Sequence, residues 1–369
     1  MLTAKLVHPE ALSSSELQAW ESFRRSDSAL ANPLLGPRWA QAVGRVRTDA
    51  AVAVFQRNGA VLGFLPHQRS GRGLARPMGA PFSDLQALIV EPGQALSLSE
   101  AVSAAGLGAF SYSGLLDSSG EATGAGGRAI AHVVVQTGDE DLAEAVRARN
   151  PKRFKNWRRL RQKLDREHGP TEVIAHDPSL GSYERLLGWK RAQLRRSGLH
   201  DVYRPAWVQQ LLRDLMAASD PEFGGYLVSL RGRDGAIAGE FGLRENGCFH
   251  PWLAGYDPAF SAYSPGILLQ LHIVEHMKAL GLRRYDLGPG SDHYKTPMAN
   301  HQVEIFSGVA TSGGRPPELW PSVLGGSRLG ARVAQRWDQI AAVETTLVGR
   351  LQGVVTAVRD GPRRLAPGA

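Results

Sequence analysis

Residues that could move protons or hold anions are concentrated near one predicted loop of the chain. Glycines on both sides of Pro289 predict a tight, exposed turn, and five side chains with this chemistry lie within ten residues around it. These side chains are Asp286, Asp292, His293, Tyr294 and Lys295. A polar surface loop has the same composition, so the cluster alone leaves a functional and a structural interpretation open.

Two further candidates for a general base lie on predicted strands. Glu240 interrupts an apolar strand, and burial there would raise the pKa of its carboxyl group. His250 lies on the next predicted strand, Phe249 to Tyr256. Each also has a structural interpretation: a solvent-exposed edge-strand carboxylate for Glu240, and a satisfied structural histidine for His250. We rank the two equally as the base.

The start of one predicted helix has residues suited to an anion. Ser264 can cap the helix, Pro265 suits the first helical position, and Gly266 lets a ligand approach the backbone. The free amides and the positive end of the helix dipole would favour phosphate. The helix is expected over Ile267 to Leu280, before the stop signal Gly281. The same residues also make an ordinary helix start.

Cysteine and metal chemistry receive less support from the sequence. Cys248 is the single cysteine, which excludes an intrachain disulfide and a cysteine-built metal site and fits a reducing compartment. Since no adjacent cation or helix start would lower its pKa, we expect a structural thiol. His272, Glu275 and His276 form a His-x-x-Glu-His pattern without an obvious third ligand. We therefore expect a solvated helix face and no metal.

A short internal match predicts that the chain has two similar halves. Arg57–Gly63 matches Arg233–Gly239 at a spacing of 176 residues, and Glu240 then corresponds to Phe64. The Asn-Gly and Asp-Gly pairs in these segments predict type I′ hairpins, and two helices precede each hairpin. The helices are expected at Ser14–Arg25, Pro37–Val46, Tyr183–Arg195 and Pro205–Ala218. We infer an α+β fold with a tandem duplication.

Further elements follow from periodicity and from stop signals. Strands are expected at Asp84–Val90, Ile130–Gln136 and Arg283–Leu287, and a weaker helix at Gln94–Ala105. A helical stretch from 140 to 168 ends at Gly169-Pro170, a helix stop that predicts the domain junction. Apolar residues at helical spacing after the Gly/Pro-rich segment beyond Thr311 predict a C-terminal amphipathic helix. The predicted division is 1–138, a basic helical linker at 139–169, 170–312, and 313–369.

The composition is that of a globular protein with one strongly basic segment. Hydrophobic residues make up 43% and charged residues 21%, which excludes a wholly disordered or collagen-like chain, and the net charge is +8. Lys152 to Arg166 contains eight basic residues and one acid, Asp165. This segment could be a solvated linker, a surface for an anionic partner such as a nucleotide sugar, polysaccharide or tRNA, or a membrane-surface patch. Helical spacing places Phe154 and Trp157 together against the core.

Membrane and secretion signals are not expected from the sequence. The first ten residues contain no apolar signal segment, and no run of about 18 uncharged apolar residues occurs. We expect a cytoplasmic protein without a transmembrane segment.

The motifs of the second half resemble a known family. The order Tyr263-Ser264-Pro265-Gly266, helix, Gly281, then Tyr285 to Gly290 and Tyr294-Lys295 is similar to the acetyltransferase-like domain of the CelD/BcsL group. That group belongs to the GNAT superfamily and is related to the Fem peptidyltransferases. The family's Lys/Arg-rich helix corresponds to the basic segment. The resemblance covers roughly Asp139 to Ala310, and the first half resembles a degenerate N-terminal partner domain.

The resemblance implies a fold of tandem GNAT-like domains with a C-terminal helix. In such domains the central strands of a mixed sheet splay around the acyl thioester, and the pyrophosphate of CoA lies on a loop that leads into a helix. The corresponding residues are Tyr263, Ser264, Pro265, Gly266 and Ile267. Because only Gly266 remains of the usual glycine-rich signature, an aminoacyl-tRNA donor, as in the Fem branch, is kept as an alternative.

The resemblance also implies an enzyme, an acyltransferase that uses acetyl-CoA or another acyl-CoA. The acceptor would be an amine or hydroxyl of a polysaccharide, an envelope-related molecule or a small molecule. Glu240 or His250 would be the base, Asp286 would position the loop, and Tyr294 would protonate the leaving thiolate. Lys295 and Trp157 are the predicted substrate-binding residues. A catalytically inactive GNAT-fold binding protein, and an oligomer, remain alternatives.

Overall fold

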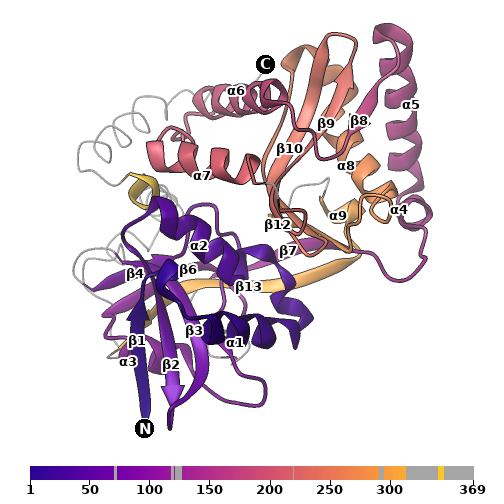
Figure 1. The fold of residues 1–369 in the computed structure, drawn as a ribbon. Coiled ribbons are helices and arrows are strands. Elements are labelled where there is room, and N and C mark those ends of the chain that lie inside the picture. Colours follow the sequence, from indigo (N-terminus) through magenta and orange to yellow (C-terminus); the bar gives the residue numbers. More distant parts are fainter. Residues whose placement is uncertain are drawn as a thin grey trace. The chain divides into compact units, whose positions relative to one another are not determined.

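The computed structural model describes residues 1–69, 73–117, 120, 127–218, 220–290, 295–312 and 340–344 (Figure 1). These residues form two compact units that are each assembled from separate stretches of chain. The first contains Met1–Ala129, Leu194–Leu211 and the described residues from Glu304 on. The second contains Ile130–Gln193 and Leu212–Val303, so the segment predicted as a basic linker lies within it.

The first unit contains a mixed sheet in the order β1-β2-β3-β4-β6-β13, with β5 paired to β3. All neighbouring strands for which a register is given are antiparallel, except for the parallel pair β4 and β6. The strands are β1 (Leu2–Val7), β2 (Ala50–Arg57), β3 (Ala60–Arg69), β4 (Leu74–Pro77), β5 (Ile89–Val90), β6 (Ala109–Leu115) and β13 (His301–Thr311). The helices are α1 (Ser14–Arg25), α2 (Pro37–Val46) and α3 (Leu98–Ala104). Short 3-10 turns occur at Pro9–Ala11, Ser28–Ala31 and Pro33–Leu35.

The second unit contains a mixed sheet in the order β7-β12-β11-β10-β9-β8, in which only β11 and β12 are parallel. The strands are β7 (Gly127–Val135), β8 (Glu172–Ile174), β9 (Phe223–Gly232), β10 (Gly235–Glu245), β11 (Cys248–Tyr256) and β12 (Arg284–Pro289). The helices are α4 (Leu142–Arg149), α5 (Pro151–His168), most of α6 (Leu180–Arg196), α8 (Pro265–Glu275) and α9 (Lys295–Met298), whereas α7 (Ala206–Met216) is divided between the units. A 3-10 helix, Pro258–Tyr263, precedes α8. The chain passes between the units within β7, α6, α7 and β13.

The core of the second unit is built from strand side chains and from the apolar faces of α5 and α8. Phe249 and Tyr285, on the neighbouring strands β11 and β12, stack with 5.6 Å between ring centroids. Phe154, Trp157 and Leu164 of α5 join the same cluster because their spacing places them on one face of the helix. The side chains of this core therefore lie directly around the strands that carry the predicted base.

Two of the predicted helices agree with the structure at both ends. Helices α1 and α2 have the predicted bounds, and Ser13 and Glu16 form a capping box at the start of α1. The predicted helix from 140 to 168 is two helices, because Pro151 disfavours helical dihedrals at Asn150. The predicted strand Asp84–Val90 is reduced to β5 and one isolated bridge. Most of the predicted C-terminal helix lies outside the described residues.

The predicted hairpins both form, but the second differs in its turn. Asn58 and Gly59 have positive φ, as a type I′ turn requires. In the second hairpin Gly235 already pairs with Gly232, so the loop is Arg233-Asp234, one residue earlier than predicted. A register shift between Ala236 and Ala238 compensates for the offset.

The mixed strand pairing and the helices of the two units confirm the predicted α+β class. Within the described parts of the chain, no helix has both the length and the apolar character needed to cross a membrane.

Candidate functional site

The strands β11 and β12 pair only at their beginnings. Cys248 lies opposite Arg284 and Phe249 opposite Tyr285, and beyond these two pairs β11 continues beside β10 while β12 continues beside β7. The parallel strands are therefore separated for most of their length. This is the splayed arrangement that the sequence resemblance implies for an acyl thioester site.

Glu240 lies inside the protein next to this pair of strands. Its side chain is 2% exposed, and it accepts hydrogen bonds from Gln270 Nε2 at 2.6 Å and from the hydroxyl of Tyr285. These partners come from α8 and β12, so the carboxylate connects three elements. The interpretation of Glu240 as a solvent-exposed edge-strand residue is wrong.

Burial raises the pKa of the Glu240 carboxyl, as the sequence predicts for a carboxylate in an apolar strand. The hydrogen bonds from Tyr285 and Gln270 act in the opposite direction, as do the charges of Lys295 and Lys190. Glu240 can therefore exchange a proton at a higher pH than an ordinary glutamate, and two lysines lie close enough to affect it.

His250 and Asp286 form a second buried group. His250 Nδ1 lies 3.7 Å from Asp286 Oδ1, and both side chains are fully buried. Asp286 also accepts from Arg284 Nη2 at 3.3 Å and from the backbone N–H of Gly288 at 3.1 Å. The bond to Gly288 is what a residue that positions this loop would make.

The two groups lie on opposite faces of the sheet. Successive side chains of a strand alternate between faces, so Tyr285 and Asp286 point in opposite directions, as do Phe249 and His250. The contacts agree, because Tyr285 stacks on Phe249 while Asp286 meets His250. Glu240 and His250 are thus separate candidates with different surroundings rather than members of one catalytic group.

The start of α8 differs from the predicted cap. Ser264 has a left-handed φ of 52° and its side chain caps no amide, because a capping side chain needs an extended backbone. Its carbonyl accepts from the amides of Ile267 and Leu268 at 3.0 and 3.2 Å. A Cβ at Gly266 would be 3.7 Å from Tyr256, so the position is not crowded and leaves space beside the helix start.

Tyr263 is engaged by the end of the basic helix. Its hydroxyl donates to Glu167 Oε2 at 2.7 Å and lies 2.9 Å from His168 Nε2. The hydrogen bond to Glu167 raises the pKa of Tyr263, and Lys163 lies over its ring at 5.2 Å. The side chain of Tyr263 therefore joins α5 to the segment before α8.

The remaining predicted residues have different placements. Lys295 Nζ donates to the carbonyl oxygen of Pro289 at 2.8 Å, and its charge reaches Glu240. Tyr294, the predicted acid, lies outside the described residues. Trp157 is 5% exposed in the core, and this packing role does not favour the predicted substrate contact. Cys248 is buried, as expected of a structural thiol.

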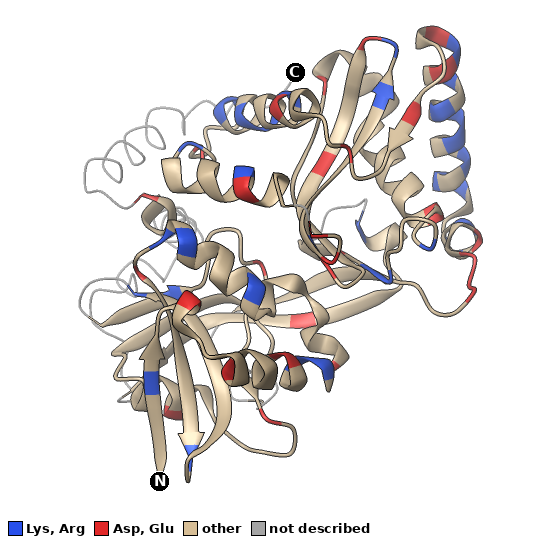
Figure 2. Ribbon diagram, in the orientation of Figure 1, with Lys and Arg blue, Asp and Glu red and all other residues tan. Residues whose placement is uncertain are grey.

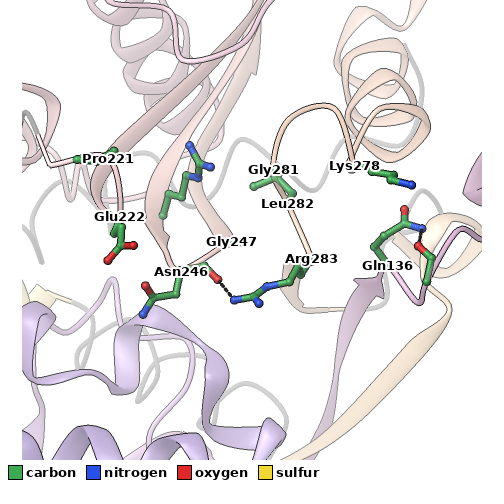
Figure 3. Close-up of a pocket in the computed structure, with 11 residues that line it drawn as sticks. Gln136, Pro221, Glu222, Asn246, Gly247, Lys278, Gly281, Leu282 and Arg283 are labelled. Carbon is green, nitrogen blue, oxygen red and sulfur yellow. Dashed lines mark hydrogen bonds between the residues drawn. The ribbon is translucent and has the colours of Figure 1, made fainter.

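An open cavity of about 600 Å³ lies at the start of β12, beside the turn that joins β10 to β11 (Figure 3). Arg283 Nη2 donates to the carbonyl oxygen of Asn246 at 2.8 Å along its wall. The lining residues are Gln136, Gly138, Pro221, Glu222, Arg244, Asn246, Gly247, Lys278, Gly281, Leu282 and Arg283. None of them is a predicted site residue, so this cavity is separate from the splayed strands.

Two partners of Glu240 were missed by the sequence reasoning. Gln270 is a polar residue within the apolar run Ile267 to Leu271, and a buried polar group in such a run is informative. Tyr285 precedes Asp286 on the same strand, so only the choice of face distinguishes it. Strand alternation shows that Tyr285 and Asp286 face opposite sides of the sheet. The contact between Tyr285 and Glu240, which are 45 residues apart, cannot be predicted from the sequence pattern.

The end of α8 brings together three possible metal ligands. Donor atoms of His272, Glu275 and His276 all lie within 4.8 Å of one another. The rings of His272 and His276 stack with 4.0 Å between centroids. Burial lowers the pKa of His272 to about 4, and His276 and Arg161 act in the same direction. The carboxylate of Glu275, which the sequence pattern already includes, therefore lies close enough to both histidines to act as a third donor.

Residues 151–296 match the family model of an acetyltransferase (GNAT) domain. The match includes α5, the strands β9 to β12 and the Glu240 group. The part of the chain that contains the splayed strands therefore has a GNAT acyltransferase fold. The finer resemblance to the CelD/BcsL group stays a prediction.

Solved structures with distant similarity include a tandem GNAT protein from the clavulanic acid biosynthesis pathway and FemX. The first is 11% identical, with a TM-score of 0.47, over 86% of this chain and 100% of that one. FemX is 13% identical, with a TM-score of 0.49, over 83% of this chain and 96% of that one. No curated protein matches the chain. At such low identity and TM-score these similarities carry no information on activity.

Proposed function

We propose that the protein is an acyltransferase that transfers an acyl group from a CoA thioester to an amine or hydroxyl. Acetyl is the acyl group that we favour. The acceptor class that we infer is a polysaccharide, an envelope-related molecule or a small molecule. The observation that carries the proposal is the splayed pair β11 and β12 beside buried Glu240, within the segment that matches the GNAT domain.

The chemistry needs a group that accepts the proton of the attacking amine or hydroxyl. Glu240 is our preferred acceptor because burial raises its pKa. Its oxygens are enclosed by Tyr285 and Gln270, so a substrate proton would reach it through the Tyr285 hydroxyl. In this relay Tyr285 gives its own proton to Glu240 and takes one from the acceptor. His250, held by Asp286 on the other face, is the competing base.

The donor would bind along β11 and at the start of α8. The backbone from Tyr263 to Ile267 is our candidate for the pyrophosphate of CoA, because Gly266 leaves space beside the helix start. Lys295, whose charge reaches Glu240, would hold a phosphate or carboxylate of the donor or acceptor. Tyr294 remains our candidate for the acid that protonates the leaving thiolate.

Calorimetric titration with acetyl-CoA, desulfo-CoA and free CoA tests the donor. We expect micromolar binding that Gly266→Glu abolishes, because the new side chain would occupy the space at the helix start with a negative charge. Gly188→Glu makes the same substitution at an exposed glycine of α6, where a new Cβ meets nothing within 4 Å, and as the matched control it should keep its affinity. Absence of binding by all three ligands would remove CoA as the donor.

A second candidate is an aminoacyl-tRNA-dependent transferase of the Fem kind. The observation that favours it is the basic surface of α5, which lies within the matched segment and ends beside Tyr263 (Figure 2). Such an enzyme would bind charged tRNA in a complex whose affinity falls steeply with salt concentration. Failure of the CoA titration together with salt-dependent tRNA binding would favour this alternative over the CoA-dependent one.

A further inference from the structure

The end of α8 presents three donor groups on one side of the helix. His272 lies one turn before His276, and Glu275 is the last residue of α8. Their donor atoms are all within 4.8 Å of one another, and the two imidazole rings lie nearly parallel at 19°. Two histidines four residues apart on a helix can bind one ion from the same face.

The hydrogen bond of His276 fixes which ring nitrogen is available. His276 Nδ1 lies 2.9 Å from the carbonyl oxygen of His272, so Nδ1 carries the hydrogen and donates it. The lone pair is then on Nε2. A histidine that binds a metal commonly donates its other N–H to a backbone carbonyl in this way, which sets the tautomer and the ring orientation. This bond is independent of the spacing of the three residues and points to the same use.

The surroundings of the group allow an ion to enter. Glu275 and His276 are exposed and His272 is half-buried, so the ligands are reached from solvent. Arg161 of α5 is close enough to affect His272 and Glu275, but it is also paired with Asp165 at 3.7 Å. Asp141, at the start of α4, adds a carboxylate near Glu275. One cation and one further carboxylate thus face the three ligands.

We propose that His272, Glu275 and His276 bind one Zn²⁺ ion or a similar divalent transition metal, with water completing its coordination. Two imidazole nitrogens and one carboxylate oxygen are a ligand set that zinc uses, whereas Mg²⁺ and Ca²⁺ prefer oxygen ligands alone. The ion joins the last turn of α8 to the segment that leads into β12. The site is independent of the proposed acyl transfer and departs from the solvated helix face expected from the sequence.

Titration of the full chain with ZnCl₂ tests the site directly. The protein is prepared without a polyhistidine tag, treated with EDTA and dialysed into metal-free buffer. We expect one ion per chain, visible absorption when Co²⁺ replaces Zn²⁺, and a higher thermal unfolding temperature with zinc present. Mg²⁺ at the same concentration should give neither binding nor stabilisation.

Variants of the two exposed ligands test whether these side chains bind the zinc ion. Glu275→Gln and His276→Asn should each weaken zinc binding by about tenfold or more without unfolding the chain, since both side chains are exposed. His301→Asn changes another exposed histidine of the same unit and should leave the affinity unchanged. Absence of zinc binding by the parent protein would overturn the proposal, as would equal affinity in the parent and both ligand variants.

Discussion

Glu240 couples its protonation state to folding because its carboxyl group is buried. In the unfolded chain its pKa is near 4.5, and burial raises it in the folded protein. The folded state therefore favours the protonated form. The stability contributed by Glu240 is complete below about pH 4.5 and is lost as the pH rises through the raised pKa, by up to about 1.4 kcal/mol per pH unit.

Glu240→Gln should remove this pH dependence. Glutamine has nearly the same shape, and its carbonyl oxygen can still accept from Tyr285 or Gln270. We expect the free energy of unfolding, measured with urea between pH 4 and roughly pH 8, to vary less with pH in the variant than in the parent. Glu222→Gln, at an exposed glutamate, should follow the parent. Identical pH profiles for the parent and Glu240→Gln would show that Glu240 does not titrate as described.

Asp286 should contribute strongly to stability. Asp286→Ala would leave Arg284, which is 9% exposed, and His250 without the carboxylate between them. We expect a loss of about 3–5 kcal/mol in the free energy of unfolding, because breaking a buried ion pair leaves an uncompensated charge. Asp139→Ala breaks the exposed pair with Lys278 and should cost at most about 1 kcal/mol. Equal losses in the two variants would contradict the difference in burial.

At the scale of single elements, local signals determined how much could be predicted. Helices α1 and α2 follow from the helical pattern before the first hairpin, a signal that extends over only a few turns. The break at Asn150 needed one more local rule, the effect of proline on the preceding residue. The turn Asn246-Gly247 between β10 and β11 carries the same Asn-Gly signal as the first hairpin, and it was overlooked.

The candidate site could be predicted only in its parts. The apolar context of Glu240 predicted a raised pKa, and the burial of the carboxylate supports it. Which side chains meet Glu240 depends on the register of β10, β11 and β12, and β10 contains two register shifts. Each shift changes which residues lie opposite, so no spacing rule leads from Glu240 to Tyr285.

The charge of α5 is arranged against the stability of the helix. Lys152, Lys155 and their basic neighbours lie in its first turns, where the positive end of the helix dipole disfavours cations. The acids Asp165 and Glu167 lie only near the other end, where they pair with basic side chains. A sequence under selection for stability alone would place these charges the other way round. We therefore expect the first turns of α5 to bind an anionic partner.

Lys152→Gln with Lys155→Gln tests this expectation by two opposite effects. The free energy of unfolding should rise by about 0.3–1 kcal/mol, chiefly through Lys152 in the first turn, while retention on a heparin column should fall to a lower salt concentration. Lys163→Gln with Arg166→Gln, in the last turns, removes the same charge and is the matched control. If both double variants lose equal retention, net charge rather than the start of α5 attracts the polyanion.

At the scale of the molecule, the two halves share an order of elements but differ at the position of the candidate base. In the first unit the counterpart of Glu240 is Phe64, which is fully buried and stacks on Trp20 with 5.0 Å between centroids. An aromatic ring there supplies packing and no proton transfer. The difference indicates that a duplicated fold would keep its chemistry in the second unit alone.

One donor molecule should therefore bind to each chain. Equilibrium dialysis with radiolabelled acetyl-CoA should saturate at a ratio of one, because buried Glu240 lies beside the splayed strands of the second unit and its counterpart in the first unit is Phe64. Phe64→Leu should keep both the ratio and the affinity, since it changes only the packing of the first unit. Gly266→Glu should abolish binding altogether. A ratio of two, or binding that survives Gly266→Glu, would place donor recognition in the first unit and contradict the division of roles between the halves.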